Sequence, residues 1–355
     1  MQTIRLAVIA GDGIGTEVVP QGLRVLAAAA EVHGGLRFEC TEFAWNCAHY
    51  VRHGAMMPAD GLATLAGFDA VFLGAVGHPD VPDHVSLWGL LIPIRRTFQQ
   101  YVNLRPVRLL RGIASPLAGR GPGDIDFVVV RENTEGEYSS IGGRIHEGTP
   151  YEVAAQVSHF SRMGVDRVVR YALDLARTRR GELTVATKSN GIVHTMPFWD
   201  EVAAAAAADY PGVRVKFAHI DALAAYFVSR PQTFDVVVGS NLFGDILTDL
   251  GAAIVGSIGI APSANLNPER RFPSLFEPVH GSAPDIAGRG IANPIGQIWT
   301  AKMLLDFFGA GEVGDLVLNA VEETLEAGVR TPDLGGRSST VEVGDAVVGR
   351  LRQGG

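Results

Sequence analysis

The chain has 355 residues, of which 47% are hydrophobic and 19% charged, a composition typical of a compact globular protein and not of a disordered one. Its formal net charge of −8, without a basic cluster, argues against nucleic acid or an anionic membrane surface as a partner. Cys40 and Cys47 are too few for a disulfide framework or a thiolate metal site, and no signal-peptide pattern or bilayer-length apolar run is present, so we expect a soluble, cytoplasmic protein with free thiols.

Short apolar runs alternate with longer segments of helical period along the chain. The expected strands are residues 4–10, 38–43, 70–73, 127–131, 183–187, 213–219 and 236–239. The expected helices are residues 17–30, 87–101, 162–177, 197–208, 222–228, 245–255, 295–308 and 312–327. This alternation predicts an α/β fold with a largely parallel sheet and helices on both faces. Segment 141–160 has no clear helical period, and the alternation at 151–157 indicates an extended arm.

A glycine-rich loop follows the first expected strand and precedes the first expected helix. It contains Gly11, Gly13 and Gly15, so its third glycine comes one residue early for the dinucleotide-binding pattern G-x-G-x-x-G. Glu39 is also a poor fit to the acidic residue that this pattern requires about 20 residues further on. A tight strand-to-helix turn explains the loop, and a role beside a bound nucleotide stays open.

Arginines occur at several focused positions in the first half of the chain. Arg95 and Arg96 are adjacent, Arg105 follows in the next segment, and Arg131 ends an apolar strand, where α/β sheets place their ligands. Guanidinium groups bind carboxylates bidentately, so converging arginines would indicate a di- or tricarboxylate substrate. Scattered surface ion pairs are the alternative for any single arginine.

Two aspartates, Asp245 and Asp249, lie four residues apart at the start of an otherwise apolar helix, so their carboxylates point to one helical face. Like charges at this spacing repel each other, and apolar neighbours make the conflict worse. A hard cation such as Mg²⁺ or Mn²⁺ removes it; an exposed acidic face near a helix N-terminus is the alternative. Asp221, which opens another helix, is either an N-cap or a third oxygen ligand.

Three further features carry candidate chemistry. Lys188 follows the apolar strand 183–187 and is a candidate base, and Tyr138 is either a packing residue or a proton donor. Segment 276–288 is a Gly/Pro/Ser-rich loop whose N–H groups suit phosphates and whose Asp285 suits ribose hydroxyls. A purely structural loop is the alternative for that segment.

Taken together, these segments resemble the β-decarboxylating dehydrogenases, the family of isopropylmalate, isocitrate, homoisocitrate and tartrate/D-malate dehydrogenases. The matching motifs run from residues 9–15 to residues 291–294 and so cover nearly the whole chain. Within the family, segment 86–96 is most similar to the tartrate and D-malate dehydrogenases. The resemblance implies an isopropylmalate dehydrogenase-like fold, with a discontinuous first domain of 1–102 plus 256–355. The second domain, 103–255, would carry the metal and substrate residues, the dimer contact and the arm.

The resemblance also implies roles for individual residues. Arg95, Arg105 and Arg131 would bind substrate carboxylates, Tyr138 would be the proton donor and Lys188 the catalytic lysine. The ligands of Mg²⁺ or Mn²⁺ would be Asp221, Asp245 and Asp249. In this family the lysine and the first aspartate act in the partner subunit's site, so Lys188 and Asp221 would act in trans in an obligate homodimer.

The family's cofactor loop matches His280, Gly281, Ser282, Ala283, Pro284, Asp285 and Ile286, with Asn293 near the adenine. Asp285 would accept hydrogen bonds from the ribose hydroxyls and repel a 2′-phosphate, so we expect NAD as the cofactor. A requirement for K⁺ is left open.

Substrate choice is expected to depend on Trp88 and Leu91. The large indole of Trp88 stands where isopropylmalate enzymes tend to carry an acid, and it would shrink the pocket in favour of D-malate, with tartrate as a further substrate. Gly89 and Leu91 offer no polar partner to a third carboxylate, which disfavours isocitrate. The alternatives are 3-isopropylmalate dehydrogenase, a metal-dependent decarboxylase without net redox change, and a non-catalytic regulatory subunit. The last would be expected to lack part of the Tyr, Lys and Asp set that is present here.

Overall fold

The computed structural model describes residues 1–354 and divides the chain into two compact units. The first unit comprises Met1–Gln100, Arg108–Asp124 and the chain from Ala252 onward, and the second comprises Tyr101–Val107 and Ile125–Gly251. Segment 108–124 thus belongs to the first unit, whereas the sequence placed it in the second domain. Arg108 and Arg111 explain the difference, because both pair with the buried Glu322 of α11 (Gly311–Glu326), at 3.1 Å and 2.8 Å.

Strands of the first unit follow the order β2 (Leu36–Glu42), β1 (Gln2–Gly11), β3 (Ala70–Ala75), β12 (Ser274–Pro278) and β11 (Pro262–Leu266). The first four are parallel, and β11 runs antiparallel to β12. On one face, α1 (Gly15–His33) and α10 (Ile295–Phe307) pack on the strands, and α11 and α12 (Thr340–Gly354) pack on these helices.

The opposite face of this sheet meets a second hydrophobic cluster. Ala7 and Ile9 of β1 and Val71 and Leu73 of β3 are buried there against short helices, because alternate residues of a strand point to opposite faces. The helical elements on this side are α2 (Cys47–His53), α3 (Gly61–Leu65), α4 (Asp83–Ser86), η1 (Leu87–Leu91) and α5 (Ile92–Thr97). Both faces of the strands are therefore covered, as parallel sheets require.

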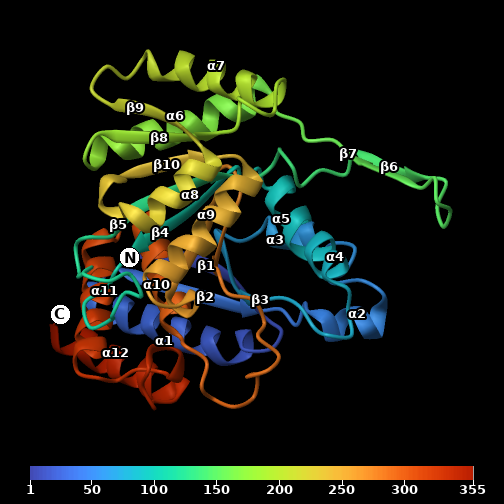
Figure 1. The fold of residues 1–355 in the computed structure, drawn as a ribbon. Helices are drawn as coiled ribbons and strands as arrows, with labels where there is room; N and C mark the ends of the chain where they lie inside the picture. Colours follow the sequence, from blue (N-terminus) through green and yellow to red (C-terminus); the bar gives the residue numbers. More distant parts are fainter. Residues whose placement is uncertain (355) are drawn as a thin grey trace. The chain divides into compact units, whose positions relative to one another are not determined.

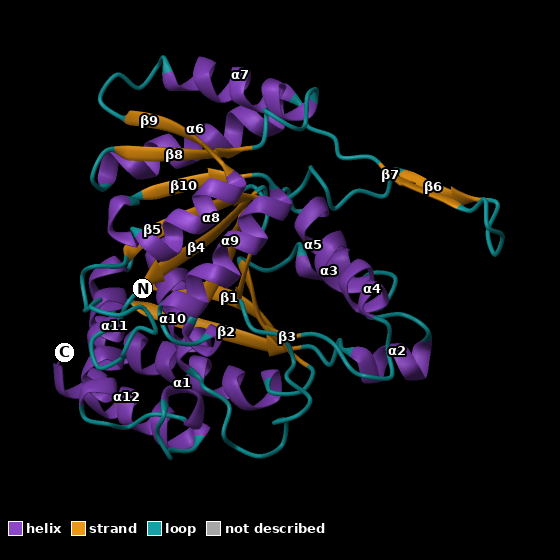
Figure 2. Ribbon diagram, viewed as in Figure 1, coloured by secondary structure: helices purple, strands orange, loops and turns teal. Residues whose placement is uncertain are grey.

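In the second unit the strand order is β4 (Val102–Arg108), β5 (Asp126–Glu132), β10 (Val236–Gly239), β8 (Glu182–Thr187) and β9 (Arg214–His219). Strands β5, β10, β8 and β9 are parallel, so their carboxyl ends share one edge. The helices of this part of the chain are α6 (Arg162–Thr178), α7 (Thr195–Ala207), α8 (Ile220–Ser229) and α9 (Asn241–Ile254). Three short 3₁₀ turns complete the described secondary structure of the chain, η2 (Pro231–Thr233), η3 (Ile258–Ile260) and η4 (Pro332–Leu334). Figure 2 shows the alternation of helices and strands, and the predicted α/β class with a mostly parallel sheet is confirmed.

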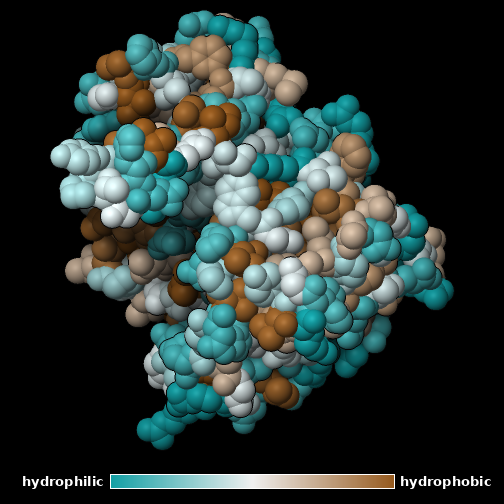
Figure 3. Space-filling view, turned by 90° about the vertical axis from the view of Figure 1, so that its right-hand side faces the viewer, coloured by the Kyte–Doolittle hydropathy of each residue, from teal (hydrophilic) through white to brown (hydrophobic). Residues whose placement is uncertain are grey.

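The segment expected to be an extended arm forms a hairpin of β6 (Gly142–Ile145) and β7 (Val153–Gln156), paired antiparallel. All of its strand residues are exposed, including the hydrophobic Ile145 and Val153, and the hairpin extends away from its unit in Figure 1. Figure 3 views the side from which the arm extends and shows hydrophobic residues among hydrophilic ones on that face.

The expected helix at 87–101 is interrupted. A π-turn, η1, precedes α5, and the N–H of Ile92 donates to the carbonyl of Leu87, five residues back. Gly89 lies in this turn, and a Cβ there would stand only 2.7 Å from Cγ of Met56. The helix then ends at Thr97 rather than at Tyr101. No helix among residues 1–354 is long and apolar enough to cross a membrane.

Candidate active site

Several expected site residues of the second unit converge on Asp245, near the start of α9. Arg105 of β4 lies with Nη1 3.2 Å from Oδ1 of Asp245, and Arg131, at the carboxyl end of β5, donates to the same oxygen. Tyr138 donates its hydroxyl to Oδ2 at 2.8 Å. The structure thus brings two arginines and a tyrosine of the predicted set to the carboxylate of Asp245.

Two residues that were not singled out from the sequence complete this arrangement. Asn241 accepts hydrogen bonds from Nε and Nη2 of Arg131 at 3.0 Å and 2.7 Å, and Thr248 accepts from Nη1 of Arg105 at 2.7 Å. Both lie on α9, four residues before and three residues after Asp245, and so on the helical face of that carboxylate. The same spacing that singled out Asp249 could have identified them.

Asp249 follows Asp245 by one helical turn and shows the predicted electrostatic conflict. Partial desolvation raises the pKa of its carboxyl, and the nearby negative charge of Asp245 raises this pKa further. Two carboxylates on one face fit a divalent cation, which prefers oxygen ligands. Among the described residues, however, no group of three or more Asp, Glu, His or Cys side chains could hold a metal ion, so this pair would need a ligand from elsewhere.

Lys188 and Asp221 meet each other at the carboxyl ends of β8 and β9. These strands pair in parallel with Thr187 opposite His219, which places the residues that follow them side by side. Nζ of Lys188 lies 2.9 Å from Oδ1 of Asp221, and the Asp221 side chain is 68% exposed. The hydrogen bond from Lys188 lowers the pKa of the Asp221 carboxyl. This aspartate therefore lies on α8, on an accessible part of its unit, whereas the other two expected metal ligands lie on α9.

In the first unit, Arg95 of α5 forms a buried ion pair with Glu277 of β12. Nη2 lies 2.6 Å from Oε1, and only 11% and 8% of the two side chains are exposed. The amide of Asn265 donates to the same carboxylate oxygen at 2.8 Å. Nε of Arg95 is buried and has no partner in the described part of the chain, which leaves a guanidinium donor suited to an anionic ligand.

The π-turn before Arg95 carries the two expected specificity residues. Trp88 is half-buried, and the guanidinium of Arg96 lies 5.0 Å from the centre of its ring, within the range of a cation–π contact. Leu91 is also half-buried and packs against the hydrophobic cluster that contains Leu90 and Ile94. π-turns are rare and are frequent at functional sites.

The expected cofactor loop connects β12 to α10 and contains neither helix nor strand. Its residues Gly281, Ser282 and Pro284, together with residues of segment 76–83, line a cavity of about 520 Å³. This cavity lies beyond the carboxyl ends of β3 and β12, where α/β sheets bind ligands, and its size suits a small molecule. Long irregular loops inside compact domains are usually functional.

Two features of this loop fit a bound group. Burial lowers the pKa of His280, whose Nε2 has no partner in the described part of the chain. Ala283 has a positive φ of 41°, a backbone conformation that costs an L-residue about 1–3 kcal/mol. Asp285 is exposed, and Asn293 is buried with its amide donating to Asp333 at 2.9 Å.

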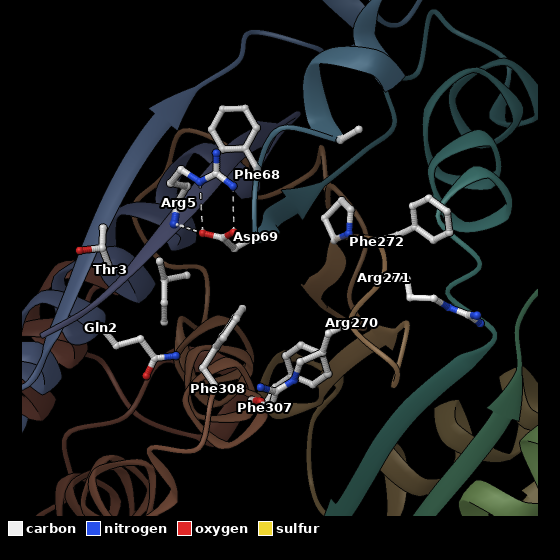
Figure 4. A pocket seen from close by; sticks show the side chains of 13 residues that line it. Gln2, Thr3, Arg5, Phe68, Asp69, Arg270, Arg271, Phe272, Phe307 and Phe308 are labelled. Carbon is white, nitrogen blue, oxygen red and sulfur yellow. Dashed lines mark hydrogen bonds and ion pairs between the residues drawn. The ribbon is translucent and has the colours of Figure 1, made fainter.

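A second cavity of the first unit, of about 430 Å³, lies at the amino ends of β1 and β3 (Figure 4). Arg5 and Asp69 face each other across a 3.1 Å ion pair, and the guanidinium of Arg270 lies 4.7 Å from the ring centre of Phe307. Arg5 is thus paired with Asp69, and Arg270 stacks on Phe307. The cavity also lies at the strand edge opposite to the one where such sheets bind ligands.

The chain belongs to the isocitrate/isopropylmalate dehydrogenase family, which matches residues 5–347. The protein is therefore an enzyme of the decarboxylating dehydrogenase class. The chain is 58% identical to the probable tartrate dehydrogenase/decarboxylase of Bacillus subtilis, over 99% of both chains. It is 60% identical to the D-malate dehydrogenase (decarboxylating) of Escherichia coli, over 98% of both. The crystal structure of isocitrate dehydrogenase from Methylococcus capsulatus matches with a TM-score of 0.88 and 32% identity, over 99% of this chain and 100% of that one.

Proposed function

We propose that this protein catalyses the oxidative decarboxylation of D-malate with NAD and Mg²⁺ or Mn²⁺, and that tartrate is a further substrate. The observation that carries the proposal is the convergence of Arg105, Arg131 and Tyr138 on Asp245, with Asp249 one helical turn away. Relatives that are 57–60% identical and named tartrate or D-malate dehydrogenases support the choice of substrate.

In this proposal Arg95, Arg105 and Arg131 bind the carboxylates of the substrate. Arg95 and Arg131 are rigid donors, because Glu277 holds the first and Asn241 the second through charge-assisted or paired hydrogen bonds. A guanidinium already fixed in one orientation loses little entropy when it binds an anion. These residues would therefore orient the substrate before any chemistry takes place.

Asp245 and Asp249 hold the divalent cation together with Asp221 of the partner subunit. The exposed position of Asp221 supports this assignment, because a ligand shared between subunits has to be accessible in the single chain. When bound, the cation supplies Lewis acidity to the substrate hydroxyl and stabilises negative charge on oxygen, while the nicotinamide accepts the hydride. The protein would thus be an obligate homodimer.

Two side chains move protons. Lys188, in the partner's site, takes the proton of the substrate hydroxyl, directly or through water, as C2 loses its hydride. Tyr138 gives a proton to the carbon from which CO₂ has departed. Its pKa is raised by desolvation and then by the adjacent charge of Asp245, so at neutral pH the hydroxyl carries the proton that it has to donate.

The cofactor site is the loop of His280, Gly281, Ser282, Ala283, Pro284, Asp285 and Ile286, with Asn293. The exposed carboxylate of Asp285 is accessible to ribose hydroxyls and would repel a 2′-phosphate, which favours NAD over NADP. Titration with NAD and NADP by calorimetry tests this assignment directly, since comparable affinity for the two would contradict it.

The substrate is tested by initial rates with D-malate, L-tartrate and 3-isopropylmalate at saturating NAD and Mn²⁺. We expect D-malate to be preferred, and a preference of about tenfold for 3-isopropylmalate would overturn the choice. NADH and CO₂ are measured together, because release of CO₂ without NADH would identify a decarboxylase without net redox change.

The metal site is tested by calorimetric titration with Mn²⁺. Asp249→Asn and Asp245→Asn should each weaken Mn²⁺ binding by about tenfold or more, because each removes an anionic oxygen ligand. Asp174→Asn, which changes a 60% exposed aspartate on α6 of the same unit, is the matched control. Unchanged affinity in both site variants would count against a cation at this position.

A further inference from the structure

The loop proposed to bind the cofactor is held by the beginning of α1, a segment far from it in sequence. The N–H of Ile14 donates to the carbonyl of Ser282 at 2.9 Å. The carboxylate of Glu17, in the first turn of α1, accepts from the N–H of Gly288 at 2.6 Å. Two hydrogen bonds therefore fix the loop on either side of its strained residue, Ala283, whose φ is 41°.

Gly13 allows this close approach. It has a φ of 53°, and a Cβ at this position would collide with the carbonyl oxygen of Ser282. The glycine-rich turn after β1 thus lies directly against the cofactor loop at Gly13.

The same segment holds the other wall of the 520 Å³ cavity. Oδ2 of Asp12 accepts from the N–H of Gly77 at 3.1 Å, and Gly77 lines the cavity opposite the loop. Oδ1 of the same carboxylate accepts from the N–H of Cys47, also at 3.1 Å. Residues 12–17 thereby connect both walls of the site.

Apolar contacts add to these bonds. Ile14, Val18 and Ala292 form a small buried cluster, and the loop residues Ala283, Ile286 and Ala287 pack against it. Strained backbone persists only where the surroundings hold it in place, and here packing and hydrogen bonds do so together. The loop is therefore ordered by the start of α1 before any ligand binds.

Glu17 is the residue of this segment that contacts the loop through its side-chain carboxylate. Its Oε1 receives the Gly288 bond, whereas its Oε2 is buried and has no partner within residues 1–354. The side chain as a whole is half-buried, and a buried carboxylate oxygen without a partner costs free energy, so Glu17 is held here by its bond to Gly288 and not by full pairing of its charge.

We infer that residues 12–17 form a brace that pre-organises the cofactor loop, and that Glu17 is a positioning residue for NAD. This inference rests on the proposed function, because it takes loop 280–286 as the NAD site. A pre-organised loop does not lose further conformational entropy when the cofactor binds, so loosening it weakens affinity without altering the reacting groups.

Glu17→Met tests the brace, because methionine keeps the length of the side chain and removes the hydrogen-bond acceptor. We expect the Kd for NAD, measured by calorimetry, to rise roughly tenfold, the effect of losing one hydrogen bond to a charged group. Hydrogen exchange at the amide of Gly288 should accelerate by a similar factor without ligand. At saturating NAD, kcat should change by less than about twofold, because Glu17 touches no reacting group.

Two further variants show whether the hydrogen bond itself is responsible for the loss of affinity. Glu17→Gln retains an oxygen acceptor for Gly288 and should restore most of the affinity, whereas it would resemble Glu17→Met if only the negative charge mattered. Glu312→Met makes the same change in the first turn of α11, at an exposed position, and should leave NAD affinity unchanged. If Glu17→Met does not fold, as judged by circular dichroism, Glu17→Ala gives the same test with less side-chain volume.

The outcomes distinguish this inference from the function on which it rests. A wild-type protein that binds no NAD overturns the proposed cofactor and the brace with it. A wild-type protein that binds NAD, with Glu17→Met binding it equally well, overturns only the brace, even if the Gly288 amide exchanges faster.

Discussion

Tyr138 donates a hydrogen bond of 2.8 Å to Oδ2 of Asp245, so the proposed proton donor is bonded to a proposed metal ligand. The guanidinium of Arg131 also lies 5.5 Å from the ring centre of Tyr138. These contacts fix the ring without any ligand. If Tyr138 is the proton donor as proposed, phenylalanine can replace its packing but not its proton.

Tyr138→Phe should lower kcat by about 10²–10⁴, the usual contribution of a general acid, and leave the fold intact. In the proposed mechanism the hydride step precedes the protonation step, so a stopped-flow trace should show a burst of NADH near one equivalent per site before slow turnover. Mn²⁺ affinity should stay within a few-fold of wild type, because Asp245 and Asp249 remain. A variant that retains wild-type kcat would exclude Tyr138 as the proton donor.

Lys188, which pairs with Asp221 in the single chain, is proposed to act in the site of the partner subunit, and mixed dimers can test this. Lys188→Ala and Tyr138→Phe should each be nearly inactive alone. If Lys188 acts in trans, a mixed dimer of the two variants contains one intact site, and random reassortment should restore roughly a quarter of wild-type activity. If Lys188 acts in cis, no site is intact and mixing restores nothing. Size-exclusion chromatography of the mixture checks that dimers form.

Replacing Trp88 should shift substrate preference without abolishing activity. Trp88→Ala removes a large half-buried ring, and in the proposed site this would leave more room for a bulky substituent on the substrate. The ratio of kcat/KM for 3-isopropylmalate to that for D-malate should rise about 10–100-fold, as expected for a difference of about 1–3 kcal/mol in apolar fit. His84→Ala, an exposed position on α4, is the control. An unchanged ratio would remove Trp88 from the determinants of specificity.

Burial lowers the pKa of His280 below its usual value of 6.5, which makes stability depend on pH. The unfolded chain takes up this proton below about pH 6.5 while the folded chain resists it, so this contribution to stability is present above that pH and is lost as the pH falls. Urea denaturation midpoints should therefore decrease between about pH 7.5 and about pH 5.5. His280→Asn should show a smaller decrease, whereas His146→Asn, on the exposed arm, should behave as wild type.

Much of the fold follows from local patterns in the sequence. Strands such as β5 and β10 are continuous apolar runs, because both faces of a parallel sheet are covered, and the arm was recognisable by the absence of a helical period. The division at 108–124 did not follow, because it depends on ion pairs of Arg108 and Arg111 with Glu322, more than 200 residues away. Ion pairs between residues so far apart in the chain leave no periodic pattern in the sequence.

The candidate site shows the same limit. Asp245 and Asp249 were recognisable because their spacing on one helix conflicts with their charge. Asn241 has the same spacing but no charge, so no electrostatic conflict drew attention to it, and its two bonds to Arg131 appear only in the structure. The contact of Glu17 with the loop could not be predicted from the sequence either, because acidic residues are common in the first turn of a helix, where the helix dipole alone accounts for them.

The π-turn at Leu87–Leu91 contains one residue more per turn than an ordinary helix. A π-turn contains its extra residue within a single turn, so deleting one residue there would close a regular turn and leave the helix that follows in nearly the same orientation. Substitution and deletion therefore have different consequences in this segment. If Trp88 sets the substrate as proposed, its substitution would change which acid is accepted, whereas loss of a single codon in the turn would remove one side chain from the segment before Arg95 and leave the ion pair of Arg95 with Glu277 in place.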